Sequence, residues 1–169
     1  HYFRGKGEST ILKKGHIFES GDILKTDKDS FAALIFIDDK SALKVKENTE
    51  IIISGKRSAK AIAKEINLDG GIIRAQVNKQ QRGDFIIRTS VSVASVKGTD
   101  FWGVVNESAG DQFFGLSGSV EITNSITGET VEMLANTTAI SLSDAFDEKS
   151  SKLTYSPLGR TKACTFFCG

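Results

Sequence analysis

Few side chains in this sequence could carry out acid-base or nucleophilic chemistry. The two histidines are His1 and His16, and His1 is the terminal residue, so a serine or cysteine nucleophile would depend on His16 as its general base. The two cysteines, Cys164 and Cys168, lie near the end of the chain with no histidine beside them. The sequence therefore predicts a protein that is not an enzyme and has no catalytic residues.

Carboxylates are the other candidates for chemistry, and the pair Asp38 and Asp39 could act in acid-base catalysis or bind calcium. Neighbouring residues at the end of a strand point to opposite faces, however, and aspartates there commonly form a solvated turn. Two cysteines are too few for a closed zinc site, and no glycine-rich phosphate-binding loop occurs. We favour the turn at Asp38–Asp39 and expect no metal and no cofactor.

The composition is that of one globular domain. The chain has 169 residues, of which 39% are hydrophobic and 25% are charged. The 22 basic residues nearly balance the 21 acidic ones, so the net charge of +1 gives no electrostatic footprint for nucleic acid. No apolar run approaches the roughly 20 residues that cross a bilayer. We expect no nucleic-acid partner and no membrane span in this chain.

Short apolar runs separated by frequent turn signals predict an all-β fold. Sixteen glycines and one proline suit a chain that turns at glycine and keeps its strands free of proline. Residues 32–37 are almost continuously apolar, which predicts a strand buried on both faces that forms a hairpin with residues 43–46. A second hairpin is expected from residues 120–124 and 130–134. Alanines and isoleucines at helical spacing favour a short helical or irregular insertion near residues 57–66, followed by a strand from Glu65 onward.

Residues 86–105 combine two strand patterns around a Gly-Thr corner. Side chains alternate along a strand, so Thr99 and Phe101 share one face while Asp100 and Trp102 share the other. Phe101 and Trp102 therefore cannot both point inward. A half-exposed Trp102 would either anchor a partner or pack beneath a loop.

The order of the motifs resembles that of a FecR-family domain. In the first half these are Gly-Asp-Ile-Leu-Lys-Thr at 21–26, the run with Asp-Asp-Lys-Ser at 33–41 and Leu-Asp-Gly-Gly-Ile-Ile at 68–73; in the second half, Phe-Ile-Ile-Arg-Thr at 85–89, Val-Lys-Gly-Thr-Asp-Phe at 96–101 and Gly-Ser-Val at 118–120. The resemblance assigns structural roles to ten residues: Gly21, Asp22, Thr26, Asp38, Gly71, Thr89, Gly98, Thr99, Phe101 and Gly118. It makes Phe101 the core aromatic and Trp102 the partly exposed one. The Thr99 hydroxyl is then expected to bond a nearby backbone group, with a substrate-binding loop as the alternative.

The resemblance implies a fold, a compartment and a domain division. The fold would be an all-β, solenoid-like stack of short strands and hairpins, with a sandwich or a roll as the alternative. The domain would occupy residues 9–140, followed by a C-terminal extension over residues 141–169. Such domains are extracytoplasmic and non-enzymatic, and in the best-known members they relay a signal from an outer-membrane transporter to a sigma factor. A periplasmic or extracellular location would permit a disulfide between Cys164 and Cys168.

Two classes of partner follow from these expectations. The favoured one is a protein of the bacterial envelope, bound through an exposed strand edge or an aromatic patch. Its candidate contact residues are Trp102, Asp100, Phe113 and Phe114. The alternative is a carbohydrate- or cell-wall-binding domain, in which Trp102, Phe113, Phe114 and Tyr155 would provide flat apolar platforms for a glycan. A long unpaired edge strand would favour the protein, and a planar array of exposed aromatics the glycan.

Overall fold

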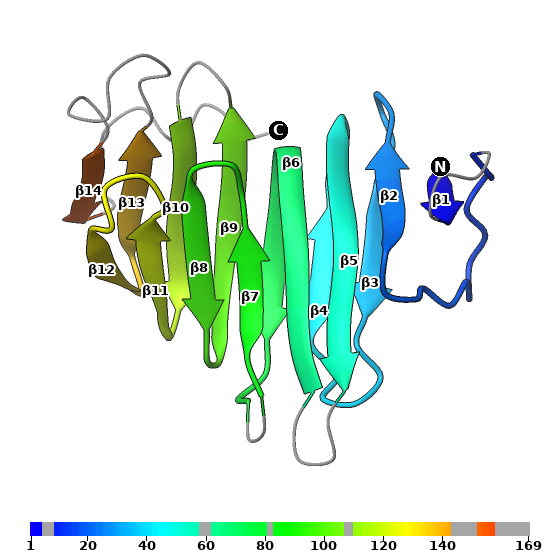
Figure 1. Cartoon of the computed structure of the whole chain (residues 1–169), viewed down its shortest axis with the longest axis horizontal. Coiled ribbons are helices and arrows are strands. Elements are labelled where there is room, and N and C mark those ends of the chain that lie inside the picture. The colour runs from blue at the N-terminus through cyan, green and yellow to red at the C-terminus, as the bar shows by residue number, and fades with distance from the viewer. Residues whose placement is uncertain (5–8, 58–61, 81–82, 107–109, 143–151, 158–169) are drawn as a thin grey trace.

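The computed structural model describes residues 1–4, 9–57, 62–80, 83–106, 110–142 and 152–157, and within them every regular element is a strand (Figure 1). The strands are β1 (Tyr2–Arg4), β2 (Asp22–Thr26), β3 (Ala32–Ile35), β4 (Ala42–Val45), β5 (Thr49–Arg57), β6 (Ile62–Val77), β7 (Phe85–Arg88), β8 (Ser92–Val96), β9 (Thr99–Asn106), β10 (Gly110–Ser117), β11 (Ser119–Asn124), β12 (Thr130–Leu134), β13 (Thr137–Leu142) and β14 (Lys152–Pro157).

The strands form two facing sheets that share β6. Sheet 1 runs in the order β1, β2, β5, β6, β7, β8, β11, β12. Sheet 2 runs in the order β3, β4, β6, β9, β10, β13, β14. Figure 1 shows them as two layers, and the strands succeed one another across the molecule from β1 and β2 at one end to β13 and β14 at the other. All described strand pairs are antiparallel except β6 with β7.

Strand β6 joins the two sheets by bending at its glycine pair. Its first half pairs with β5 and β7, and from Gly71 onward it pairs with β4 and β9. Gly71 has a φ of 96°, and a Cβ there would lie 2.2 Å from the Thr49 Oγ1 atom. The Thr49 hydroxyl accepts the N–H of Ile72 at 2.9 Å, which fixes the chain just past the bend. Only glycine fits this position.

The core lies between the sheets because each strand turns every second side chain inward. The largest fully buried side chains are those of Phe85, Phe101, Phe113, Leu24, Leu43, Ile51, Ile66, Leu68, Ile73, Ile87, Ile122 and Met133. Burial of a side chain of this size stabilises the fold by roughly 1.5–3 kcal/mol. The core is therefore the main source of stability.

The all-β prediction is confirmed, and so are the two predicted hairpins, β3–β4 and β11–β12. The hairpins stack in chain order, but they build two sheets and not a continuous coil, so the sandwich fits better than the solenoid. The expected division at residue 140 falls inside β13, and β14 pairs with β13 along sheet 2.

The predicted helix near residues 57–66 is wrong where the structure describes it. Arg57 ends β5, and residues 62–66 begin β6; residues 58–61 lie outside the described part of the chain. Lys64, Ile66 and Leu68 are all buried. That two-residue period is the signature of a strand, and pairing with β5 on one side and β7 on the other outweighs the helical propensity of the alanines.

The prediction that residues 32–37 form a strand buried on both faces is also wrong. Strand β3 pairs with β4 alone, so it forms the edge of sheet 2. Leu34 is half-buried and packs against the core, whereas Ile35 and Ile37 are 65% and 74% exposed. A continuous apolar run shows that neither face of the strand carries polar side chains. It does not show that other strands or loops cover both faces.

The bend in β6 gives a first prediction. Gly71→Ala should lower the free energy of unfolding by about 2–4 kcal/mol, because the new methyl group meets Thr49 in a backbone conformation that already disfavours L residues. Urea unfolding monitored by circular dichroism measures the change. The matched control is Gly128→Ala, since Gly128 also has a positive φ, 74°, but has no atom within 4 Å of the added Cβ. The control should cost about 1–2 kcal/mol, and equal losses in the two variants would refute the steric account.

Candidate functional site

The motif threonines Thr26 and Thr99 bond backbone groups at the ends of strands, Thr26 at the end of β2 and Thr99 at the start of β9. The Thr26 Oγ1 atom donates to the carbonyl of Lys46 at 2.5 Å and accepts the N–H of Thr49 at 3.1 Å. The Thr99 Oγ1 atom donates to the carbonyl of Ser119 at 2.5 Å, as expected for the Gly-Thr corner. These hydroxyls tie turns to strands that are distant in the sequence, so these motif residues serve the scaffold.

Thr89 takes part in a buried polar link between the two sheets. Its hydroxyl accepts the N–H of Ser92 at 2.8 Å and contacts the carboxylate of Asp111 on β10. The Ser92 hydroxyl donates to the same carboxylate at 2.5 Å. Burial raises the pKa of Asp111, and the two hydroxyl donors oppose that rise. The cluster thus joins sheet 1 to sheet 2, although it requires the Asp111 carboxyl to be partly removed from water.

Two glycines allow the β8–β9 turn and the β10–β11 turn to pack against each other. Gly98 has a φ of 142° and Gly118 a φ of 71°. A Cβ on Gly118 would lie 2.4 Å from the carbonyl oxygen of Gly98 and 3.2 Å from Thr99. The β8–β9 and β10–β11 turns therefore pack closely only because Gly118 lacks a side chain.

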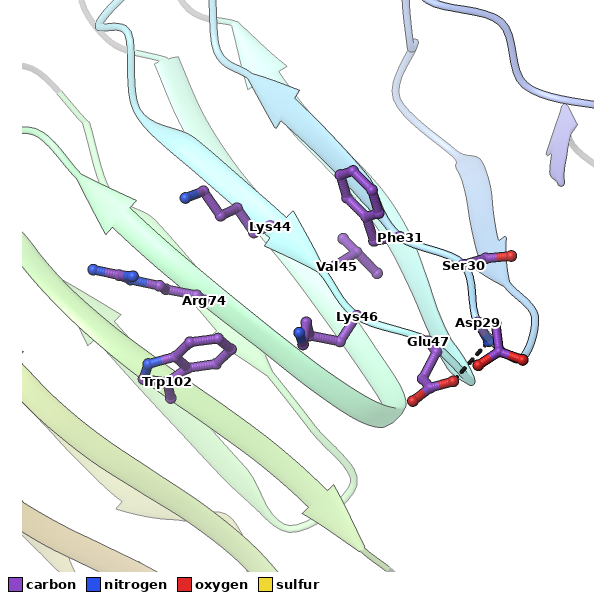
Figure 2. Close-up of a pocket in the computed structure, with 9 residues that line it drawn as sticks. All are labelled: Asp29, Ser30, Phe31, Lys44, Val45, Lys46, Glu47, Arg74 and Trp102. Atoms are coloured by element: carbon purple, nitrogen blue, oxygen red, sulfur yellow. Dashed lines mark hydrogen bonds between the residues drawn. The ribbon is translucent and has the colours of Figure 1, made fainter. Parts of the chain in front are cut away.

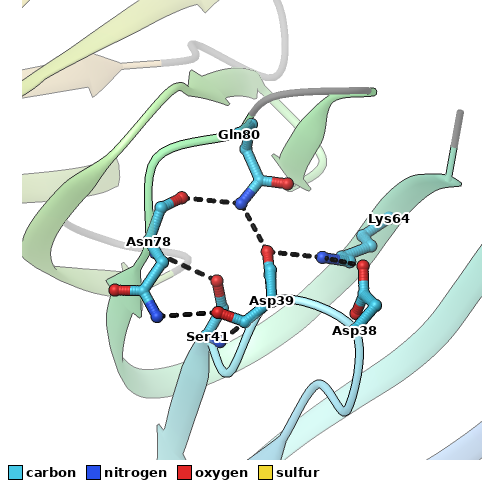
Figure 3. Close-up of polar contacts among 6 residues, drawn as sticks. All are labelled: Asp38, Asp39, Ser41, Lys64, Asn78 and Gln80. Atoms are coloured by element: carbon cyan, nitrogen blue, oxygen red, sulfur yellow. Dashed lines mark hydrogen bonds and ion pairs between the residues drawn. The ribbon is translucent and has the colours of Figure 1, made fainter.

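A second polar cluster surrounds Asp38 and Asp39 after β3 (Figure 3). Lys64 of β6 is only 4% exposed, and its Nζ atom lies 2.5 Å from Asp39 Oδ2 and 2.8 Å from Asp38 Oδ2. Asp39 also accepts a hydrogen bond from the Gln80 amide and one from the backbone N–H of Ser41. The predicted turn is present, but its carboxylates neutralise a buried lysine and are not simply solvated.

Hydrogen bonds hold Asp39 in its ionised form. Burial on its own raises the pKa of Asp39, but the donors on Lys64, Gln80 and Ser41 outweigh it and lower the pKa to about 2. Asn78 reinforces the turn, since its side-chain amide donates to the carbonyl of Asp39 at 2.8 Å. The cluster fastens the β3–β4 turn to β6 and to the segment after it.

A hollow of about 470 Å³ on the outer face of sheet 2 contains the predicted Trp102 (Figure 2). Lys44, Arg74 and Trp102 lie in register on the adjacent strands β4, β6 and β9. The Arg74 guanidinium lies 5.7 Å from the centroid of the Trp102 ring, a cation–π distance. Phe31, which precedes β3, and Lys46, which follows β4, also line the hollow.

Arg74 and Asp100 neutralise one another in this face. The Arg74 Nε and Nη2 atoms donate to the two Asp100 carboxylate oxygens at 2.9 and 2.8 Å. Hydrogen bonding to Asp100 raises the pKa of Arg74, and the same contact lowers the pKa of Asp100. Among the residues that the structure describes, Lys44 and Lys46 make no such ion pair. Lys44 is near enough to Asp100 to help lower the pKa of that carboxyl, and Asp29 and Glu47 line the same hollow, so the face carries charges of both signs while Lys44 and Lys46 form no ion pair within the described part of the chain.

The structure separates the four predicted contact residues. Trp102 is half-buried on the outer face and Phe101 fully buried on the inner one, which confirms the predicted alternation. Phe113 and Phe114 are wrong as contact residues: Phe113 is fully buried opposite Gly103, and Phe114 is only 8% exposed. Asp100 lies on the outer face but is held by Arg74.

The glycan alternative is not supported by these positions. Two of its four aromatic residues, Phe113 and Phe114, are buried, and the side chain of Tyr155 lies outside the described part of the structure. Trp102 alone does not make a planar array. Cys164 and Cys168 also lie outside the described residues, so their disulfide stays a prediction.

The sequence analysis missed an apolar surface at the end of the sandwich where β3 lies. Phe31 is 80% exposed, and Ile35 and Ile37 extend the same outer face. Ile11 and Ile17 are exposed in the segment that precedes β2. The apolar run at residues 32–37 was the sequence feature that indicated this surface. It predicted a strand buried on both faces because the sequence does not show that the strand lies at a sheet edge.

The described residues contain no group of three or more His, Cys, Asp or Glu side chains placed to hold a metal ion. Within the same residues no helix is long and apolar enough to cross a membrane. Within the described residues the arrangement offers contact surfaces.

Comparisons with known proteins agree with this picture. The family model described as "FecR protein" matches residues 22–121. Two crystal structures of a "putative anti-sigma factor" from Parabacteroides distasonis, at 1.65 and 2.50 Å resolution, have the same fold, each with a TM-score of 0.65 and 13% sequence identity. The match covers 80% of this chain and 59% of theirs, so this chain spans little more than half of that protein. The search of curated proteins found no match.

The Asp39 cluster predicts how stability depends on pH. Because the pKa of Asp39 falls from 3.8 to about 2 on folding, its contribution is complete above about pH 4 and is lost as the pH falls toward 2. The free energy of unfolding should decline over this window by about 2 kcal/mol more in the wild type than in Asp39→Asn. Urea titrations from pH 2 to 6 measure this difference, and parallel curves for the two proteins would contradict it.

Proposed function

This chain belongs to the FecR family, and on that basis we propose that it is a non-enzymatic signalling module of the bacterial envelope that binds a protein partner. The observation that carries the proposal is the concentration of exposed apolar side chains at one end of the sandwich. Five of the eight large hydrophobic side chains that are exposed in the described structure come from two segments at that end, residues 11–17 and 31–37. They are Ile11, Ile17, Phe31, Ile35 and Ile37, of which Ile11 and Phe31 line a common hollow.

Such a concentration is unusual for a surface that meets only water. Single exposed hydrophobic residues are common on soluble proteins, but gathered ones mark interaction sites. Phe31 and Trp102 both line the hollow on sheet 2, and large aromatic residues are frequent anchors in protein interfaces. Phe31 and Trp102 lie beside the charged side chains of Lys44 and Lys46, and protein interfaces commonly combine an apolar centre with a polar rim.

The family and the structural neighbours support a regulatory role. Membership of the FecR family implies an extracytoplasmic protein that relays signals, which supports the proposal, and the neighbouring structures are described as a "putative anti-sigma factor". Because their sequence identity is only 13%, the structural similarity supports the fold alone, and the signal relay is part of our proposal. In this view the motif residues Gly71, Thr89 and Thr99 hold the scaffold, and the outer face and edge of sheet 2 make the contact.

The test is capture of envelope proteins by the purified, immobilised domain. We expect Phe31→Ser/Ile35→Ser to reduce recovery of the partner roughly tenfold or more, because two apolar anchors are removed, while Trp102→Ala weakens it less. Quantitative mass spectrometry after crosslinking measures the recovery.

Leu134→Ser is the matched control, since Leu134 is an exposed apolar residue on β12, outside the apolar surface around β3. It should recover the partner as the wild type does. Circular dichroism must show that every variant is folded. Equal recovery by all variants, or recovery of no specific protein, would count against the proposed function.

A further inference from the structure

The outer edge of β3 carries backbone hydrogen-bonding groups that no described residue satisfies. The Phe36 N–H donates to the Ser41 carbonyl, which makes this a hydrogen-bonded pair of the β3–β4 hairpin. In an antiparallel ladder such pairs alternate with pairs that direct their N–H and C=O groups outward. The register Ala33 with Lys44 therefore leaves the N–H and C=O groups of Ala33 and Ile35 pointing away from β4.

Apart from its short length of four residues, β3 lacks the devices that normally protect a sheet edge from pairing with another chain. Natural edges are blunted by charged side chains, proline or bulges. The edge strand of sheet 1, β12, exposes Glu132 on such a position. On β3 the outward side chains are Phe31, Ala33, Ile35 and Ile37, none of them charged.

The edge is also held in place for pairing. The turn that follows β3 is fastened to β6 by the ion pairs of Asp38 and Asp39 with Lys64. Leu34 and Phe36 pack inward against the core. A strand that is fixed on one side and open on the other loses little conformational entropy when a partner strand binds.

Charge distinguishes the kinds of chain that the edge could accept. Ala33 lies beside Lys44, and the same register continued by one residue places Phe31 beside Lys46. Both lysines project from the outer face without an ion pair among the described residues. Because Ala33 is small, an acidic side chain on an added strand can reach over it toward Lys44, while apolar side chains on that strand pack on Phe31 and Ile35.

We propose that β3 is the docking site for the partner, which adds an extended acidic and apolar segment of its chain as a new edge strand of sheet 2. The inference rests on the proposed function and specifies how the partner is bound. Backbone hydrogen bonds to Ala33 and Ile35 supply affinity, and the alternation of apolar and acidic side chains supplies specificity. A second copy of this chain is a poorer occupant, because its own Lys44 and Lys46 would add positive charge to the same face.

The probe is a capped heptapeptide, Thr-Ile-Thr-Glu-Thr-Ile-Thr, whose outer face offers isoleucine, glutamate and isoleucine in either strand direction. Titration into the ¹⁵N-labelled domain should shift the amide signals of residues 31–37 and 44–46 saturably. Replacing the central glutamate by lysine should weaken binding roughly tenfold at low salt, because attraction to Lys44 becomes repulsion.

Ala33→Pro separates strand addition from simple apolar contact. Proline removes the outward N–H of Ala33, and it is tolerated at an edge position whose N–H faces solvent. The variant should stay folded and lose peptide binding. Glu132→Pro is the matched control: the β11–β12 register and the Asn124–Glu129 hydrogen bond direct the Glu132 N–H outward from sheet 1, so this variant should bind the peptide normally.

The outcomes are distinct from those of the capture experiment. If Phe31→Ser/Ile35→Ser abolishes capture but Ala33→Pro does not and the peptide fails to bind, the proposed function stands and strand addition is refuted. Dimerisation of the domain in analytical ultracentrifugation that Ala33→Pro abolishes would assign the edge to a second copy and would also refute the proposal. Saturable binding that depends on glutamate and on the Ala33 N–H supports it.

Discussion

The fold depends on one strand that belongs to both sheets. Strand β6 spans 16 residues and pairs with β5 and β7 in sheet 1 and with β4 and β9 in sheet 2. A strand can change sheets only where its backbone bends sharply, and Gly71 provides that bend against Thr49. Because the hairpins on either side are built onto β6, its register sets which side chains of both sheets face the core.

Polar clusters fix the sandwich where hydrophobic packing alone would not specify it. Lys64 is buried beneath the β3–β4 turn, and Asp111 is buried between Thr89 and Ser92. Burying a charge is costly unless it is paired and hydrogen-bonded, so each cluster is stable in one arrangement of turns and strands. The Lys64 cluster has a further consequence for function, since it holds the exposed edge strand β3 against the body of the domain.

Scaffold and contact surface are therefore carried by different residues. The residues that make the chain recognisable as a FecR domain, such as Thr26 and Thr99, bond the backbone at turns. The residues of the proposed contact surface, such as Phe31 and Lys44, lie on the outer face of sheet 2 and belong to none of the structural motif positions.

The sequence by itself determined the features that depend on local alternation. The strand class, the two hairpins and the opposite orientations of Phe101 and Trp102 all follow from a period of two along the chain. Tertiary structure decided what covers each strand: β3 is an edge, Phe114 is buried although it shares the outer face with Trp102, and the helix-like alanines near residue 62 join a strand. The physical reason is that alternation is a property of neighbouring residues, whereas burial depends on which distant strand lies alongside, and no local pattern records that.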